Sequence, residues 1–160
     1  MLKMFIFAIA LLIAFALGAV YFYGVMYPRV PFPTNSTWRQ FTVGDHVFQV
    51  DIADTGEKRM QGLSGRDPLD PDEGMLFIFD SPGMLGFWMK DMKFDIDIIW
   101  IRDGKVIGFS QNAKAEPEKS LLQLPLYYPP ERAKEVLEVN AGTVARLGIK
   151  VGDSAEFLSR

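Results

Sequence analysis

The sequence predicts an α+β protein that is predominantly β, with a curled antiparallel or mixed sheet, or a small barrel, and two or three short helices. Short apolar segments of strand length dominate the chain after residue 37. Glycine and aspartate occupy the turns between these segments, which is typical of β-hairpins. Strands do not alternate with long helical segments, as they would in a parallel α/β sheet. An apolar N-terminal segment adds one predicted transmembrane helix.

Residues 1–27 form the predicted membrane anchor. The stretch from Met4 to Met26 has no charged side chain, and its length of about 23 residues is enough for a helix to cross a bilayer. Ala14-Phe15-Ala16 also resembles a signal cleavage site, so the alternative is a cleaved signal peptide and a secreted or periplasmic protein. One lysine, Lys3, precedes the segment and no basic cluster follows it. We therefore expect a cytoplasmic N-terminus and an extracytoplasmic domain.

Residues 28–37 form a predicted linker between the anchor and the domain. Three prolines and several small polar residues favour a semi-extended chain that holds the domain away from the bilayer. Asn35-Ser36-Thr37 matches a glycosylation acceptor, which matters only where the source organism modifies such sites. Residues 38–160 then form a single predicted β-rich globular domain.

The elements of this domain follow from turn signals and apolar patterns. Gly44-Asp45 and Asp103-Gly104 each separate two apolar runs, and each predicts a β-hairpin. Asp54 with Glu57 resembles a capping box and predicts a short helix that Gly62 ends. The predicted helices are 55–61 and 143–148. The predicted strands are 38–43, 46–53, 75–79, 86–90, 94–102, 105–111, 133–140 and 155–158.

Composition excludes several classes of site. The chain has a net charge of −3, no cysteine and one histidine, His46. An acidic protein lacks the basic surface that a nucleic-acid backbone requires. Disulfides, thiolate catalysis and multi-histidine metal sites are excluded by the residue counts. We therefore expect no nucleic acid, no metal and no cofactor.

The densest group of residues that could carry chemistry lies between positions 86 and 101. Trp88 and Lys90 share one face of the predicted strand 86–90, and Asp97 lies on the next predicted strand. If these strands are neighbours, Lys90 pairs with Asp97 at the mouth of a pocket floored by Trp88. Such a pair is either a structural ion pair or part of a ligand-binding or catalytic site. Asp95 and Asp97 alone offer too few ligands for a divalent cation.

Three further side chains complete the candidates. Arg66, in a glycine-containing loop, is suited to bind a carboxylate, either within the protein or on a ligand. Tyr128, with Tyr127 and Trp88, either forms an aromatic platform for a sugar or peptide or covers the open end of a barrel. Glu138 is expected to be exposed on an alternating strand rather than to act as a general acid.

Several motifs occur together in a fixed order and resemble one known family. They are Gly62-Leu63-x-x-Arg66, Gly74-Met75-Leu76-Phe77-x-Phe79, Phe87-Trp88-Met89-Lys90, Asp97-Ile98-Ile99-x-Ile101, Val136-Leu137-Glu138-x-Asn140-Ala141-Gly142 and Gly148-Ile149-x-x-Gly152-Asp153. Over roughly residues 47–158 the chain resembles the family called domain of unknown function 192. The resemblance implies a compact β-rich α+β fold and no established activity. It gives added weight to Arg66, Trp88, Lys90 and Asp97.

The chain departs from the family pattern at two places. Ser64 stands where the family usually has methionine after Gly-Leu, and Asp91-Met92 follows Lys90 where the family usually has Asn-Thr. If that polar pair belongs to a site, the site is altered in this protein.

Three functions fit these observations. The first is a membrane-anchored extracytoplasmic module that binds envelope polysaccharide or peptide near Trp88, Lys90 and Asp97. The second is an enzyme of unknown reaction in which Asp97 is the general base and Lys90 tunes it. The third is a structural or accessory domain that docks on a membrane partner. Whether the protein is an enzyme, and its oligomeric state, stay open.

Overall fold

One mixed β-sheet organises the part of the chain that the computed structural model describes, residues 38–158. The predicted anchor, 1–27, and linker, 28–37, lie outside the described residues. Within 38–158 no helix has the length and apolar character needed to span a bilayer.

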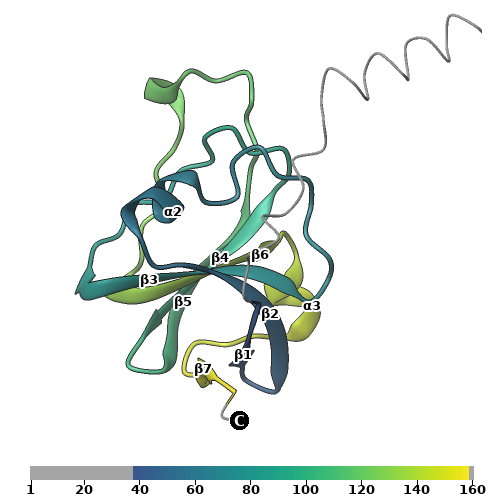
Figure 1. Cartoon of the computed structure of the whole chain (residues 1–160), viewed down its shortest axis with the longest axis vertical. Coiled ribbons are helices and arrows are strands. Elements are labelled where there is room, and N and C mark those ends of the chain that lie inside the picture. The colour runs from purple at the N-terminus through teal and green to yellow at the C-terminus, as the bar shows by residue number, and fades with distance from the viewer. Residues whose placement is uncertain (1–37, 159–160) are drawn as a thin grey trace, which may run out of the picture. The chain divides into compact units, whose positions relative to one another are not determined.

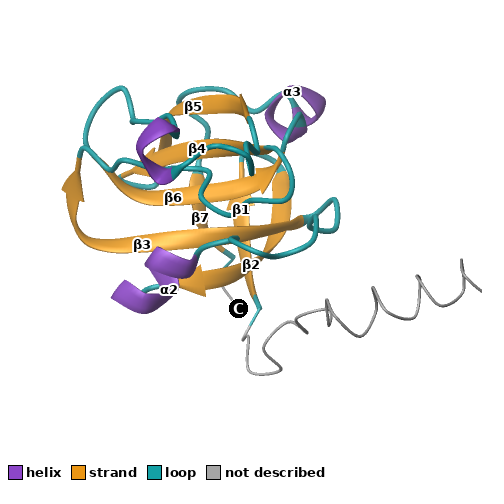
Figure 2. Ribbon diagram, turned by 90° about the horizontal axis from the view of Figure 1, so that it is seen from above, coloured by secondary structure: helices purple, strands orange, loops and turns teal. Residues whose placement is uncertain are grey.

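Seven strands form this sheet in the order β5-β4-β6-β3-β2-β1-β7 (Figures 1 and 2). Their bounds are β1 Arg39–Val43, β2 His46–Ala53, β3 Glu73–Gly83, β4 Ile96–Arg102, β5 Lys105–Ala113, β6 Ala133–Asn140 and β7 Ala155–Phe157. Every neighbouring pair is antiparallel except β2 and β3, which are parallel and are connected through helix α2, Gly56–Gln61. The sheet is therefore mixed.

The two edge strands of the sheet approach each other. The amide of Val106 in β5 donates to Asp153 O at 2.9 Å, and the amide of Gly152 donates to Val106 O at 2.8 Å. These contacts lie immediately before β7, so the sheet curls into a half-barrel, as the sequence predicts. Gly44 and the pair Asp103-Gly104 have positive φ, as their tight hairpin turns require.

Within residues 38–158 two short helices accompany the sheet. Thr55 caps α2 by accepting a hydrogen bond from Lys58 N at 3.2 Å, and α3 spans Thr143–Leu147 (Figure 1). A short 3-10 turn, η1, covers Leu121–Gln123. The predicted strand 86–90 is wrong, since Phe87 forms only one isolated bridge, with Tyr127. The chain turns after this bridge, where Asp91 has a φ of 54°.

The central strands of the sheet are buried on both faces. All seven strands contribute to one core cluster, which fills the concave side. On the convex side, loops and apolar side chains of β2 to β6 form a second cluster. In β4 the two clusters alternate: Ile99 and Ile101 belong to the first, while Ile98 and Trp100 belong to the second. The sheet thus offers two distinct environments for polar side chains.

Candidate functional site

Asp97 is a buried structural acceptor on the concave side of the sheet. Its side chain is fully buried, and its two oxygens accept hydrogen bonds from Asn112 N at 2.8 Å and Val144 N at 2.9 Å. The first bond holds β5 where Asn112 has a positive φ of 54°, and the second satisfies an amide in the first turn of α3. Asp97 therefore ties β4 to both β5 and α3.

The predicted ion pair between Lys90 and Asp97 is wrong. Lys90 contacts the carboxylate of its neighbour Asp91, and both of these side chains are largely exposed. Asp97 faces the same side of β4 as Ile99, in the concave core, whereas the segment around Trp88 packs over the convex side. A sheet between the two charges prevents their contact.

A pocket of about 570 Å³ lies on the convex side of the sheet. It is bounded by α2, β3 and two loop segments, 84–92 and 126–128. Aromatic side chains form much of its lining: Phe77, Phe79, Phe87, Trp88 and Tyr128. Pockets with mainly apolar walls and a few polar groups are typical small-ligand sites. The sequence-based candidates Trp88 and Tyr128 are thus brought together, while Lys90 and Asp97 do not line this pocket.

The two loop segments of the pocket wall are held together by backbone and ring contacts. Phe87 and Tyr127 exchange backbone hydrogen bonds of 2.9 and 2.8 Å. The Phe87 ring packs edge-on against Phe77, with centroids 4.9 Å apart, and against Trp100 at 5.5 Å. Gly86 allows Tyr128 to approach, because a Cβ at this position would lie 3.0 Å from the tyrosine ring. This wall is therefore anchored to the core.

Glu138, on β6, is the acidic side chain of the pocket lining. Only 4% of its surface is exposed, so the predicted exposure of Glu138 is wrong. The side chains of β6 alternate between its two faces, but both faces are covered, and Glu138 lies in register between Met75 of β3 and Ile98 of β4. Burial raises the pKa of its carboxyl to about 8, against the lowering effect of the Arg66 charge. The carboxyl is therefore mostly protonated at neutral pH.

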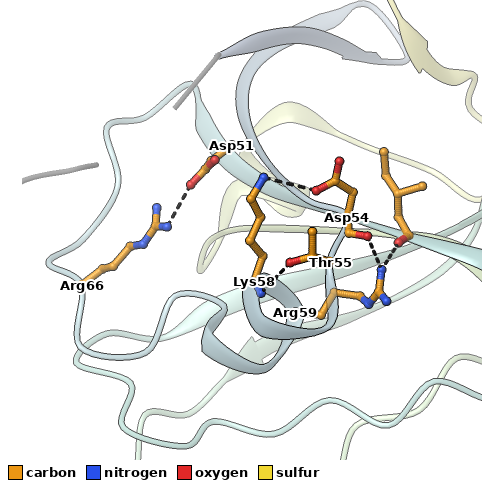
Figure 3. A network of polar contacts seen from close by, with 7 residues as sticks. Asp51, Asp54, Thr55, Lys58, Arg59 and Arg66 are labelled. Atoms are coloured by element: carbon orange, nitrogen blue, oxygen red, sulfur yellow. Dashed lines mark hydrogen bonds and ion pairs between the residues drawn. The ribbon is translucent and has the colours of Figure 1, made fainter. Parts of the chain in front are cut away.

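Arg66 binds a carboxylate within the protein. Its Nη2 donates to Asp51 Oδ2 at 2.8 Å, and both side chains are mostly buried (Figure 3). Asp51, Met75 and Glu138 occupy matching positions on β2, β3 and β6, so the two acids lie on the same face. The Arg66 charge is thus balanced by Asp51 and acts on Glu138 as a neighbour.

Arg59 is a pocket-lining residue that the sequence did not single out. Its Nη1 donates to the carbonyl oxygens of Asp54 and Ile78, both at 2.8 Å (Figure 3). Its guanidinium lies over the Phe79 ring, 5.0 Å from the centroid. Arg59 therefore fastens α2 to β3 at one side of the pocket.

Within residues 38–158 no group of three or more His, Asp or Glu side chains is arranged to hold a metal ion. The site is instead an aromatic pocket with one buried acid and one fixed guanidinium.

Fold and pocket together define a small β half-barrel domain with an apolar cavity on its convex face. The chain belongs to the family domain of unknown function 192, described as an uncharacterized ACR, whose profile matches residues 39–157. A search of curated proteins gave no match.

The solved structures that are similar to this chain include the two that follow. The first is a protein of unknown function from Novosphingobium aromaticivorans DSM 12444, with 33% identity and a TM-score of 0.69. That match covers 78% of this chain and 89% of the other. The second, from Sinorhizobium meliloti 1021, is described as a candidate transcription regulator, with 30% identity and a TM-score of 0.69. It covers 79% of this chain and 98% of the other, so a related chain folds with little beyond this domain.

Proposed function

We propose that this protein is an extracytoplasmic peptide-binding domain, tethered to the membrane by residues 1–27, that holds a peptide side chain in the convex pocket. The observation that carries the proposal is the pocket itself. Its volume of about 570 Å³ can accept a large side chain, and Trp88 and Tyr128 at its opening are 36% and 52% exposed. Partly exposed aromatic side chains beside a cavity are frequent anchors of protein–peptide contacts.

The lining favours a peptide over a polysaccharide. A sugar ring presents hydroxyl groups that need several hydrogen-bond partners, and the walls here are mainly aromatic and aliphatic. The backbone next to the pocket also suits an extended chain. Strand β3 continues to Gly83, beyond Phe77, its last pairing with β2. In the described part of the chain no other strand pairs with that edge, and beyond Ile78, whose carbonyl oxygen already accepts from Arg59, a peptide could add to it.

The other two functions have weaker support. The structure does not support Asp97 as a general base tuned by Lys90, since Asp97 is fully buried and accepts hydrogen bonds from two backbone amides. Docking on a membrane partner through the same convex face is compatible with the pocket, but a cavity rather than a flat apolar patch favours a side-chain-sized ligand.

A peptide array probed with residues 34–160 tests the proposal. Trp88→Ala removes part of the opening, and we expect it to weaken binding at least tenfold while the melting temperature changes little. The matched control is Leu122→Ala, since Leu122 is 97% exposed and does not line the pocket. Peptides that bind the Trp88 variant as well as the wild type, or the absence of any binding peptide, would overturn the proposal.

A further inference from the structure

The lining of the convex pocket includes one buried acid, Glu138, in an apolar surrounding. Arg66 makes its ion pair with Asp51, and its charge also lowers the pKa of Glu138, but burial outweighs this effect and raises that pKa. Glu138 is 4% exposed, and the neighbouring side chains in register with it, Met75 and Ile98, are apolar. A buried carboxylate in such a place is costly until a cation arrives.

The walls above this acid suit a cation on an apolar stem. Five aromatic side chains line the pocket, and their ring faces attract ammonium groups. The remaining lining includes Met60, Leu63 and Met84, against which methylene groups can pack. Arg59 also lines the pocket, but its guanidinium is fixed on two carbonyl oxygens and the Phe79 ring.

We infer that the convex pocket selects an aliphatic stem that ends in an ammonium group, as in a lysine side chain of the bound peptide, and that Glu138 is the counter-ion. This inference rests on the proposed peptide-binding function and names its ligand chemistry. The stem lies against the aromatic walls, and the ammonium displaces the proton of the Glu138 carboxyl.

The displaced proton gives binding a diagnostic pH dependence. Burial raises the pKa of Glu138 to about 8, so at pH 7 most molecules must lose a proton before the ammonium can pair. The affinity for an ammonium ligand therefore rises about tenfold between pH 7 and pH 9, while a lysine ammonium, with a pKa of about 10.4, stays charged. A neutral ligand that accepts a hydrogen bond from protonated Glu138 would show the opposite trend. The charged groups around this face are Arg66, Asp51 and Arg59.

Calorimetry with residues 34–160 tests the inference. The probes are end-blocked pentapeptides Ala-Ala-X-Ala-Ala in which X is lysine, norleucine or glutamate, with hexylamine and 1-hexanol as free counterparts. We expect the lysine peptide to bind at least tenfold more tightly than the norleucine peptide at pH 9, and the glutamate peptide to bind least. Glu138→Gln keeps the size of the side chain and cannot ionise, so it should abolish both the lysine preference and the rise of affinity with pH.

The possible outcomes distinguish the ammonium inference from the proposed peptide-binding function. Equal affinities for lysine and norleucine, or tightest binding of glutamate, overturn the ammonium inference and leave peptide binding standing. Hexylamine that binds through Glu138 while no peptide binds supports the ammonium inference and overturns the peptide function. A lysine preference that survives in Glu138→Gln overturns the role of this acid. No binding by any probe overturns both proposals.

Discussion

Replacing Asp97 by alanine tests the assignment of this residue to the fold rather than to a site. Asp97→Ala removes the acceptor of two backbone amides, those of Asn112 and Val144. A hydrogen bond to a charged group contributes about 1.5–3 kcal/mol, so the loss is about 3–6 kcal/mol in the free energy of unfolding. This is a large share of the roughly 5–15 kcal/mol that stabilises a typical domain. Asp97→Asn retains one carbonyl acceptor and should lose about half as much.

Urea unfolding of residues 34–160, followed by circular dichroism, measures these changes. The matched control is Lys90→Ala, since Lys90 contacts only the exposed Asp91 carboxylate among the described charges and should change stability by less than about 0.5 kcal/mol. The double variant should equal the sum of the two single ones, because the two side chains do not touch. A loss below about 1 kcal/mol for Asp97→Ala, or a coupling above about 1 kcal/mol with Lys90, would refute the reasoning.

Three further predictions concern Glu138, Arg66 and the topology. Folding raises the pKa of Glu138 from 4.5 to about 8, so the stability that protonated Glu138 contributes is complete below pH 4.5 and is lost as the pH rises through 8. Relative to Glu138→Gln, the free energy of unfolding of the wild type, measured in urea, should fall by a few kcal/mol over this range. Parallel curves for the two proteins would contradict the burial argument. Arg66→Ala removes the charge that lowers this pKa, so the Glu138 titration followed by NMR should move to still higher pH, and an unchanged or lower midpoint would contradict the contact. Because the chain has no cysteine, Ser120→Cys in an exposed loop places one thiol on the domain. A membrane-impermeant maleimide should label this thiol in intact cells and should not label the control Leu2→Cys. The reverse pattern would contradict an extracytoplasmic domain.

The sequence predicts most of the fold because its signals are local. A Gly-Asp or Asp-Gly pair and the apolar residues on either side of it are enough to predict a hairpin, and both predicted hairpins are present. The segment 86–90 is apolar like a strand, but its backbone partner is a single residue of a distant loop, Tyr127. Pairing between remote segments leaves no local pattern in the sequence.

The candidate site was predicted less well, for a related reason. Trp88 and Asp97 are close in sequence, but the sheet separates them. The core cluster that each face of β4 packs against depends on the strand order β4-β6-β3. A signal for Glu138 was present, since it is flanked by Leu137 and Val139, which pack in the concave core. Strand β6 lies between β4 and β3, and both faces of the sheet are covered there, so β6 has no solvent-exposed face. Arg59 left no signal, because its role depends on carbonyl groups of two other segments.

Methionine-methyl NMR of residues 34–160 tests the location of the binding site most directly. Met60, Met84 and Met92 line the pocket, so their methyl signals report its occupation by hexylamine or the lysine peptide. The account predicts that the signals of Met60 and Met84 shift along the same saturation curve as the calorimetric binding, and that Trp88→Ala weakens both. Saturated binding that leaves both signals unmoved would place the ligand elsewhere and contradict the convex pocket as the functional site.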